Sequence, residues 1–303
     1  MASRDVVLGI FFLSHTVVGA LGNSSLLLHF LVLDFTRCRV RPTDLILKHL
    51  IVANLLSLLC KGVPQSMAAF NLKFYLGDFE CKLLFYLHRV GRGVSIVTTC
   101  LLSVFQTITI RPSESWWEEL KVKAPRYIGS SMYLSWVLNL LINIIILMYI
   151  TGKRNNTTMT NLKDFGYCFS VRHNTVTDSL HAALLTFPDG VCVGLMLWAN
   201  SSVVLILYRH KQRMQPILKT SCPRSSPESR ATKTILLLVS TFVFFYTLSC
   251  IFQVCLSVVY NPNWFLVNMA AIVSGCFPVV SPFLLMSRDS RSCFVWIHNR
   301  KSP

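Results

Sequence analysis

The chain has 303 residues, of which 53% are hydrophobic and only 14% are charged, and its formal net charge is +16 at pH 7. Soluble proteins carry about 25% charged residues, so this composition argues against a soluble chain and predicts a membrane protein. The positive charges are spread between apolar stretches and form no separate basic domain, which excludes a nucleic-acid-binding protein.

Seven apolar stretches are long enough to cross a bilayer, which takes about 20 mostly apolar residues. They occupy most of the chain, so we expect an all-α membrane protein, a seven-transmembrane helix bundle formed by a single domain of residues 1–303. A short amphipathic C-terminal helix is expected on the inner leaflet after the last span. The predicted spans are residues 6–33, 45–70, 83–110, 128–150, 181–208, 234–260 and 265–286.

Lysine and arginine are distributed unequally between the stretches that connect these spans. If the N-terminus is extracellular, 18 of the 29 Lys and Arg residues lie on the cytoplasmic side and 7 on the outer side. An excess of cations marks the cytoplasmic side of membrane proteins. We therefore expect a multi-pass protein with its N-terminus outside. The first span is too long for the apolar core of a signal peptide, so we expect no cleavable signal.

Ionisable residues lie inside three of the predicted spans. At 1.5 Å per residue, Lys61 lies about 14 Å below the outer end of the second span. In the third span His88 precedes Arg89 and Arg92, which lie about 12 and 16 Å deep, and in the fifth span Asp189 lies about 12 Å deep. A charge at membrane depth costs roughly 2.5–3.5 kcal/mol on the insertion scale, so such residues indicate a functional site by default.

The charges at this depth do not balance. Asp189 can neutralise at most one of the three cations, so the others need carbonyls, water or an anionic ligand. Arg89 and Arg92 are three residues apart and share one face of the helix. We expect an outward-facing, water-accessible pocket for an anionic or strongly polar group. Two alternatives stay open: the arginines are satisfied within the protein, or Lys61 extends toward the membrane surface.

The outer loop of residues 151–179 carries two sequence signals. Asn155 and Asn156 each begin a glycosylation sequon, and the two sequons overlap. Because the two asparagines are adjacent, we expect only one of them to carry a glycan. Cys168 is the only cysteine of this loop, and Cys81 is the only other outer cysteine. Two cysteines in an oxidising compartment without other partners predict a disulfide. On the inner side, residues 113–126 are expected to form a short polar loop.

The sequence contains no enzyme motif. It has no His-x-x-x-His pair, no P-loop and no Gly-x-Ser-x-Gly. Gly91-Arg92-Gly93 lacks the third glycine and the preceding strand of a dinucleotide fingerprint, and we expect a close-packing point there. We therefore expect no enzyme activity, no cofactor and no metal site.

A set of short motifs extends from the second span to the last. They are HL..AN at residues 49–54, KGVPQ at 61–65, LLSVFQ at 101–106, FV..Y at 242–246 and CFP..SPF at 276–283. As a set they resemble the vomeronasal type-1 receptors, which are G-protein-coupled pheromone receptors. The resemblance implies a plasma-membrane receptor that detects a pheromone-like small molecule and signals through a heterotrimeric G protein, with lipids as its other partners.

The chain departs from the rhodopsin-like pattern at the inner end of the third span. Phe105, Gln106 and Thr107 stand where that class has Asp-Arg-Tyr, and we expect them to face the G protein. Gln106 cannot form an arginine-based ionic lock, so the resting contacts of such receptors do not transfer. Two other functions stay open: a small-solute transporter or channel, and a receptor-like protein that no longer signals.

Overall fold

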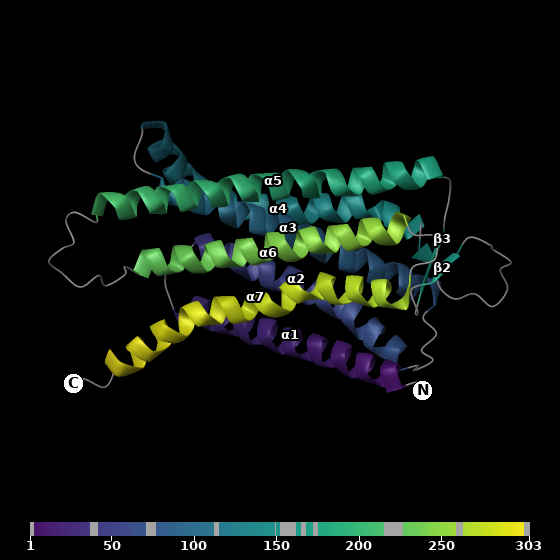
Figure 1. Cartoon of the computed structure of the whole chain (residues 1–303). Coiled ribbons are helices and arrows are strands. Elements are labelled where there is room, and N and C mark those ends of the chain that lie inside the picture. The colour runs from purple at the N-terminus through teal and green to yellow at the C-terminus, as the bar shows by residue number, and fades with distance from the viewer. Residues whose placement is uncertain are drawn as a thin grey trace. The chain divides into compact units, whose positions relative to one another are not determined.

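The computed structural model describes residues 3–36, 42–70, 77–111, 115–148, 150–151, 162–164, 168–171, 175–214, 227–258 and 263–299. Within these ranges the chain is almost entirely helical (Figure 1). The helices are α1 (Ser3–Thr36), α2 (Pro42–Ala69), α3 (Asp78–Ile110), α4 (Ser115–Asn143), α5 (Thr175–Met214), α6 (Pro227–Val258) and α7 (Trp264–Asn299). Seven predicted spans are thus matched by seven α-helices among the described residues.

A small sheet lies between α4 and α5 in the chain. After α4 come a short 3₁₀ helix, η1 (Ile144–Met148), and three strands, β1 (Ile150–Thr151), β2 (Leu162–Asp164) and β3 (Phe169–Val171). The strand order is β1-β3-β2, and both pairs are antiparallel. The sheet places the segment after Cys168 between two other pieces of the outer loop.

Six of the described helices are long and apolar enough to cross a membrane. The exception is α4. Its predicted span, residues 128–150, contains the apolar run IIILM near its end, but the structure places that run in η1 after α4 has ended at Asn143. The α-helical part therefore lacks the most apolar residues of the predicted span.

Two segments rich in charged residues extend helices beyond the predicted spans. Residues 113–126 were expected as a loop, which is wrong, because α4 begins at Ser115. Ion pairs between Glu119 and Lys123 and between Glu118 and Lys121 join residues one helical turn apart, which stabilises a helix. The C-terminal stretch is helical as expected, and it continues α7 without a break as far as Asn299. No proline or glycine follows Pro282 within α7 to end the helix earlier.

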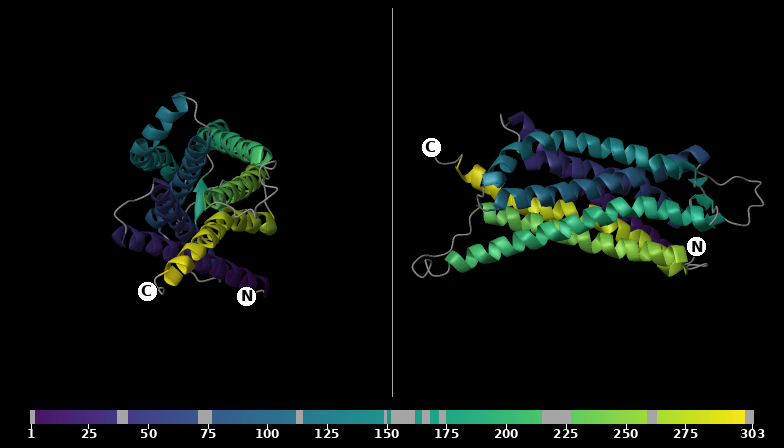
Figure 2. Two further views of the ribbon diagram at one scale, coloured as in Figure 1. Left: turned by 90° about the vertical axis from the view of Figure 1, so that its left-hand side faces the viewer. Right: turned by 90° about the horizontal axis from the view of Figure 1, so that it is seen from above.

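The residues form two compact units, and α3, α4 and α5 each contribute to both. The first unit comprises Met1–Thr98 and Ser130–Val191, and the second Thr99–Gly129 and Cys192–Pro303. In the first unit α1 packs along α2, and in the second α6 packs along α7 (Figures 1 and 2). The α6–α7 contact includes Phe242 and Phe277, whose rings meet edge to face with their centroids 4.6 Å apart. The expectation of a single domain stays a prediction.

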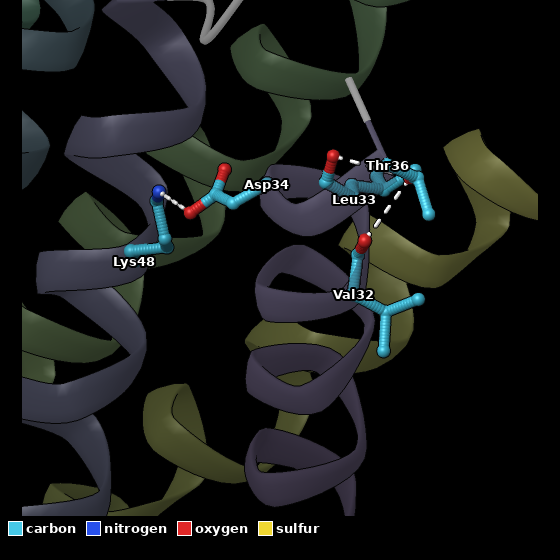
Figure 3. A network of polar contacts seen from close by, with 5 residues as sticks. All are labelled: Val32, Leu33, Asp34, Thr36 and Lys48. Atoms are coloured by element: carbon cyan, nitrogen blue, oxygen red, sulfur yellow. Dashed lines mark hydrogen bonds and ion pairs between the residues drawn. The ribbon is translucent and has the colours of Figure 1, made fainter. Parts of the chain in front are cut away.

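An ion pair connects α1 to α2 near the end of α1. Figure 3 shows the Lys48 ammonium directed at the Asp34 carboxylate. Of the two side chains, 16% and 33% are exposed. The Thr36 hydroxyl donates to the carbonyls of Val32 and Leu33 at 3.0 and 3.3 Å. The threonine thereby adds hydrogen bonds to carbonyl groups in the last turn of α1.

Candidate ligand-binding site

The outer end of α3 is joined covalently to the outer loop. Cys81 lies in the first turn of α3, and its disulfide partner Cys168 lies directly before β3. Both cysteines are fully buried and pack with Ile150 of β1, against the partly buried side chains of Phe85 and Tyr86. The expected disulfide is therefore present, and it sits in a small apolar cluster that links the sheet to α3.

Four of the predicted site residues come together within the first unit. Lys61 lies on α2, and His88, Arg89 and Arg92 lie on α3, all of them half-buried. The three cations are close enough to His88 for their charges to act on its ring, and Lys61 and Arg92 are likewise close to each other. We call these four residues the cationic cluster.

His88 is held by one residue of the neighbouring helix. Its Nδ1 lies 3.1 Å from the hydroxyl oxygen of Ser57 and 3.1 Å from the Ser57 carbonyl oxygen. A hydrogen bond to the carbonyl requires the proton on Nδ1, which leaves Nε2 as the acceptor nitrogen of the neutral ring. Ser57 was not predicted as a site residue. Its only signal is a small polar side chain in an apolar helix, which is too common to single out one position.

The close approach of α3 to α2 depends on Gly91. A Cβ atom at this position would lie 2.8 Å from the Ala53 carbonyl oxygen and 2.9 Å from the Ser57 backbone nitrogen. One turn further along α3, the Ser95 hydroxyl donates to Asn54 Oδ1 at 2.8 Å. The backbones therefore meet without an intervening side chain, as small residues allow in membrane helices. The expected close-packing point at Gly91 is confirmed.

A second side chain packs against α3 from α4. A Cβ atom on Gly93 would collide with the Asn139 side-chain oxygen, and the Asn139 amide donates to the Ser135 carbonyl at 2.9 Å. Trp136, on the same helix, donates from Nε1 to His49 Nδ1 of α2 at 3.1 Å. These contacts hold α4 beside α2 and α3, and Gly93 directly follows Arg92 of the cationic cluster.

For Asp189, the structure describes its position on α5 and its burial. It is half-buried in the outer part of α5, one residue after Pro188, and its residue range belongs to the first unit. The contacts described above bring together Lys61 and the α3 residues, and the meeting of Asp189 with them stays a prediction. Asn155 and Asn156 lie outside the described residues.

The inner part of α3 makes hydrogen bonds to two other helices of the second unit. Gln106 donates from Nε2 to the Thr232 carbonyl of α6 at 3.4 Å. The Thr107 hydroxyl lies 3.0 Å from the Ser103 carbonyl and 3.2 Å from the Ala199 carbonyl of α5. Gln106 and Thr107 are buried, whereas Phe105 is half-buried. The segment expected to face a G protein is thus tied to α5 and α6 in this conformation.

Comparison with known proteins identifies the family. A family model described as the vomeronasal organ pheromone receptor family matches residues 6–297. The chain belongs to this family. It is 58% identical over 300 residues to "Vomeronasal type-1 receptor 4" of Homo sapiens, an alignment that covers 98% of this chain and 99% of that protein. It is 52% identical over 287 residues to "Vomeronasal type-1 receptor 2" of Homo sapiens, covering 93% of this chain and 73% of that protein.

More distant comparisons agree with this assignment. "Olfactory receptor class A-like protein 1" of Danio rerio is 28% identical over 284 residues, which is 93% of this chain and 89% of that protein. The crystal structure of squid rhodopsin matches with a TM-score of 0.68, and the match covers 92% of this chain and 77% of the rhodopsin chain. Its sequence identity is 17%, so this match shows the fold alone.

Family and fold together define the class of molecule. This vomeronasal receptor is a G-protein-coupled chemosensory receptor and a multi-pass membrane protein. The family expected from the sequence motifs and the helical membrane fold are both confirmed. The transporter or channel alternative is set aside, because the relatives named above are receptors, and for the same reason the chain is not an enzyme.

Proposed function

We propose that this receptor binds a small, pheromone-like molecule with an anionic or strongly polar group in an outward-facing pocket. The cationic cluster supplies the positive charge, and Asp189 supplies a carboxylate at similar depth. The observation that carries this proposal is the gathering of Lys61, Arg89 and Arg92 around His88 in the outer half of α3. The disulfide lies about two helical turns further out and ties the outer loop to the same helix.

The physical argument rests on the cost of like charges in a poorly solvated place. Each cation of the cluster disfavours the others, because the protein interior screens charge less than water does. An anionic ligand reduces that repulsion, and it accepts hydrogen bonds from guanidinium and ammonium groups. Bonds of this charge-assisted kind are about twice as strong as neutral ones. Relief of this repulsion would contribute to the binding energy.

The proposed location is the plasma membrane, with the N-terminus extracellular. The excess of Lys and Arg in the predicted cytoplasmic stretches supports this orientation. The Cys81–Cys168 disulfide supports it as well, because disulfides persist in oxidising compartments. Asn155 or Asn156 would then carry a glycan. Treating intact cells with an impermeant N-glycosidase should increase the mobility of the receptor on a gel, and an unchanged mobility would contradict the glycan at this position.

We place the G-protein contact at the inner end of α3, around Phe105, Gln106 and Thr107. Since Gln106 and Thr107 are buried against α6 and α5, a heterotrimeric G protein reaches them only after α6 has moved away from Gln106. The hydrogen bond from Gln106 to the Thr232 carbonyl is neutral, so breaking it exposes one amide and one carbonyl and no buried charge.

The decisive experiment measures ligand-dependent signalling of the receptor expressed with a G protein. A panel of small molecules, with matched anionic and neutral members, is applied to cells bearing the unaltered receptor. The double variant Arg89→Gln/Arg92→Gln is then compared at equal surface expression. We expect the concentration for half-maximal response to rise at least about tenfold for anionic ligands, since a lost charge-assisted contact costs about 1.5–3 kcal/mol.

A matched control uses a lysine on the same helix outside the cluster. Lys82 is paired with Asp78 at 2.7 Å near the outer end of α3, and Lys82→Gln should leave the response unchanged. An unaltered response of the double arginine variant would rule out the anion site. Signalling by no ligand in the unaltered receptor, with normal surface expression, would favour a receptor-like protein that no longer signals.

A further inference from the structure

Two cysteines of neighbouring helices meet inside the second unit. The thiol groups of Cys100 of α3 and Cys192 of α5 lie close enough to act on each other. Neither belongs to the disulfide of the outer loop, and both are in the reduced state. Cys100 is 6% exposed, whereas Cys192 is half-buried. The proposed function uses neither residue.

The register of the two helices supports this meeting independently of the cysteines. Thr107 and Ala199 are joined by a hydrogen bond of 3.2 Å, and each lies seven residues after one of the cysteines. Seven residues are about two turns of an α-helix, so a position and its seventh successor lie on nearly the same face. Cys192 thereby extends the buried stripe formed by Met196, Ala199 and Val203. Two contacts with one offset show that α3 and α5 run side by side here.

We propose that Cys100 and Cys192 form a redox-sensitive dithiol, at which an organic hydroperoxide closes a second disulfide. The Cys192 thiolate attacks the hydroperoxide, the O–O bond breaks, and a sulfenic acid and an alcohol result. The Cys100 sulfur then attacks the sulfenic sulfur, forming the S–S bond and releasing water. In sum, two thiols and one hydroperoxide give one disulfide, one alcohol and one water. The thiol pair loses two electrons, and the hydroperoxide accepts them.

The location of the pair selects this kind of oxidant. Hydroperoxides that form on unsaturated acyl chains arise within the bilayer, where both cysteines lie. An apolar setting disfavours the reactive thiolate, which keeps isolated buried cysteines inert. Here the neighbouring thiol serves as the resolving cysteine that reactive thiols in redox sensors commonly have. Closure would fix α3 against α5 two turns above the Thr107 contact.

The experiment uses the whole receptor reconstituted in phosphatidylcholine nanodiscs and treated with cumene hydroperoxide. Unreacted thiols are then blocked, the protein is digested, and the peptides are mapped by mass spectrometry. We expect a crosslinked peptide pair containing Cys100 and Cys192, with the mass of two hydrogens lost. The Cys81–Cys168 pair in the same digest serves as an internal reference for a disulfide-linked peptide. Oxidation of Cys100 and Cys192 to separate sulfinic acids, without a crosslink, would overturn the proposal.

Variants test whether each cysteine depends on the other. In Cys192→Ser, Cys100 should stay reduced under conditions that oxidise it in the unaltered receptor. Cys255→Ser removes another half-buried thiol of the same unit, and it should leave the crosslink intact. Equal oxidation of Cys100 with and without Cys192 would refute the pairing. Because the readout is a crosslinked peptide, it does not depend on ligand or G protein. If a variant fails to fold, the presence or absence of the crosslink in the unaltered receptor still tests the proposal.

Discussion

At the scale of single residues, the cationic cluster depends on a position that carries no charge. Gly91 lies between His88 and Arg92 in the sequence and faces the backbone of α2. Only a residue without a Cβ atom permits this distance, since the atoms a Cβ would meet are a carbonyl oxygen and a backbone nitrogen. Backbone atoms cannot turn aside as a flexible side chain can, so the helices themselves would have to separate.

We therefore predict that Gly91→Ala destabilises the receptor. Overpacking at a close contact typically costs about 1–3 kcal/mol. The separation of the helices should also lengthen the hydrogen bonds from His88 to Ser57. A lower melting temperature of the purified receptor in detergent is the measurement that checks this expectation.

The control for this substitution is Gly194→Ala. Gly194 lies in the interior of α5, and a Cβ atom there meets nothing within 4 Å. Alanine is the better helix former, by about 0.8–1 kcal/mol, so the melting temperature should stay the same or rise. If both variants melt at the same temperature, the close approach at Gly91 is not what makes glycine necessary there.

The residues of the candidate site could be predicted to different degrees. The cations of α3 were found from the sequence because charge in an apolar span is rare and costly. Ser57 was not predicted, because a serine in a membrane helix costs little free energy. Its hydroxyl can donate a hydrogen bond to a backbone carbonyl of its own helix. Which residue pairs with a buried polar group depends on how neighbouring helices are aligned along each other. The sequence of one helix does not give this alignment.

At the scale of helices, the ion pair of Asp34 and Lys48 links α1 to α2. Asp34 lies two residues before the last residue of α1, where the negative end of the helix dipole disfavours a carboxylate. Lys48 compensates for this unfavourable placement. Because only 16% of Lys48 and 33% of Asp34 are exposed, water screens the pair less than a surface pair.

We predict a measurable coupling between these two residues in a double-mutant cycle of Asp34→Asn and Lys48→Gln. Each single variant leaves one half-buried charge without its partner, whereas the double variant leaves none. The coupling energy should be at least about 1 kcal/mol, within the range of about 0.5–3 kcal/mol for residues in direct contact. Thermal or denaturant unfolding of the purified receptor in detergent provides the four stabilities.

An exposed ion pair serves as the reference for this cycle. Lys82 and Asp78 are one turn apart in α3, and 35% and 54% of their side chains are exposed. Their coupling should be no more than about 0.5 kcal/mol. A coupling for Asp34 and Lys48 that does not exceed the reference would show that burial adds nothing to the link between α1 and α2.

The ends of helices were predicted less well than their existence. The apolar runs located seven helices, because apolar length is what membrane insertion requires. The runs could not show that α4 begins at Ser115 or that α7 continues to Asn299, since both extensions mix apolar residues with charged ones. Helix propensity and ion pairs such as that of Glu119 and Lys123 determine where such helices end. Hydropathy measures neither of these.

At the scale of the whole molecule, topology explains why the outer disulfide was predictable. Once the spans and their orientation were predicted, two cysteines were expected on the outer side. Neither had another outer cysteine as a possible disulfide partner. The bond spans 87 residues of sequence and joins the start of α3 to the residue of the outer loop directly before β3. In contrast, the thiol contact between Cys100 and Cys192 was not predicted, because six reduced cysteines of the described residues lie within helices and any two of them could have met.

We predict that Cys81→Ser and Cys168→Ser destabilise the receptor equally and that the double variant is no less stable than either. Each single change removes the same bond, so the effects cannot add. The cost should be about 2–4 kcal/mol, the usual value for a disulfide. For a freely unfolding chain, a loop of this length would cost about 4–5 kcal/mol, but the helices on either side stay inserted and already limit the loop. The melting temperatures of the three variants in detergent give the comparison.

The buried setting of this disulfide makes the prediction specific. Cys81 and Cys168 are fully buried with Ile150, so the bond also anchors β1 and the apolar cluster to α3. Breaking it should release the sheet first and expose Phe85, which lies about one helical turn above Arg89. Limited proteolysis should therefore cut the outer loop of the variants under conditions that leave the loop of Cys255→Ser intact. A loop that is cut at the same rate with and without the bond would mean that strand pairing alone holds it over α3.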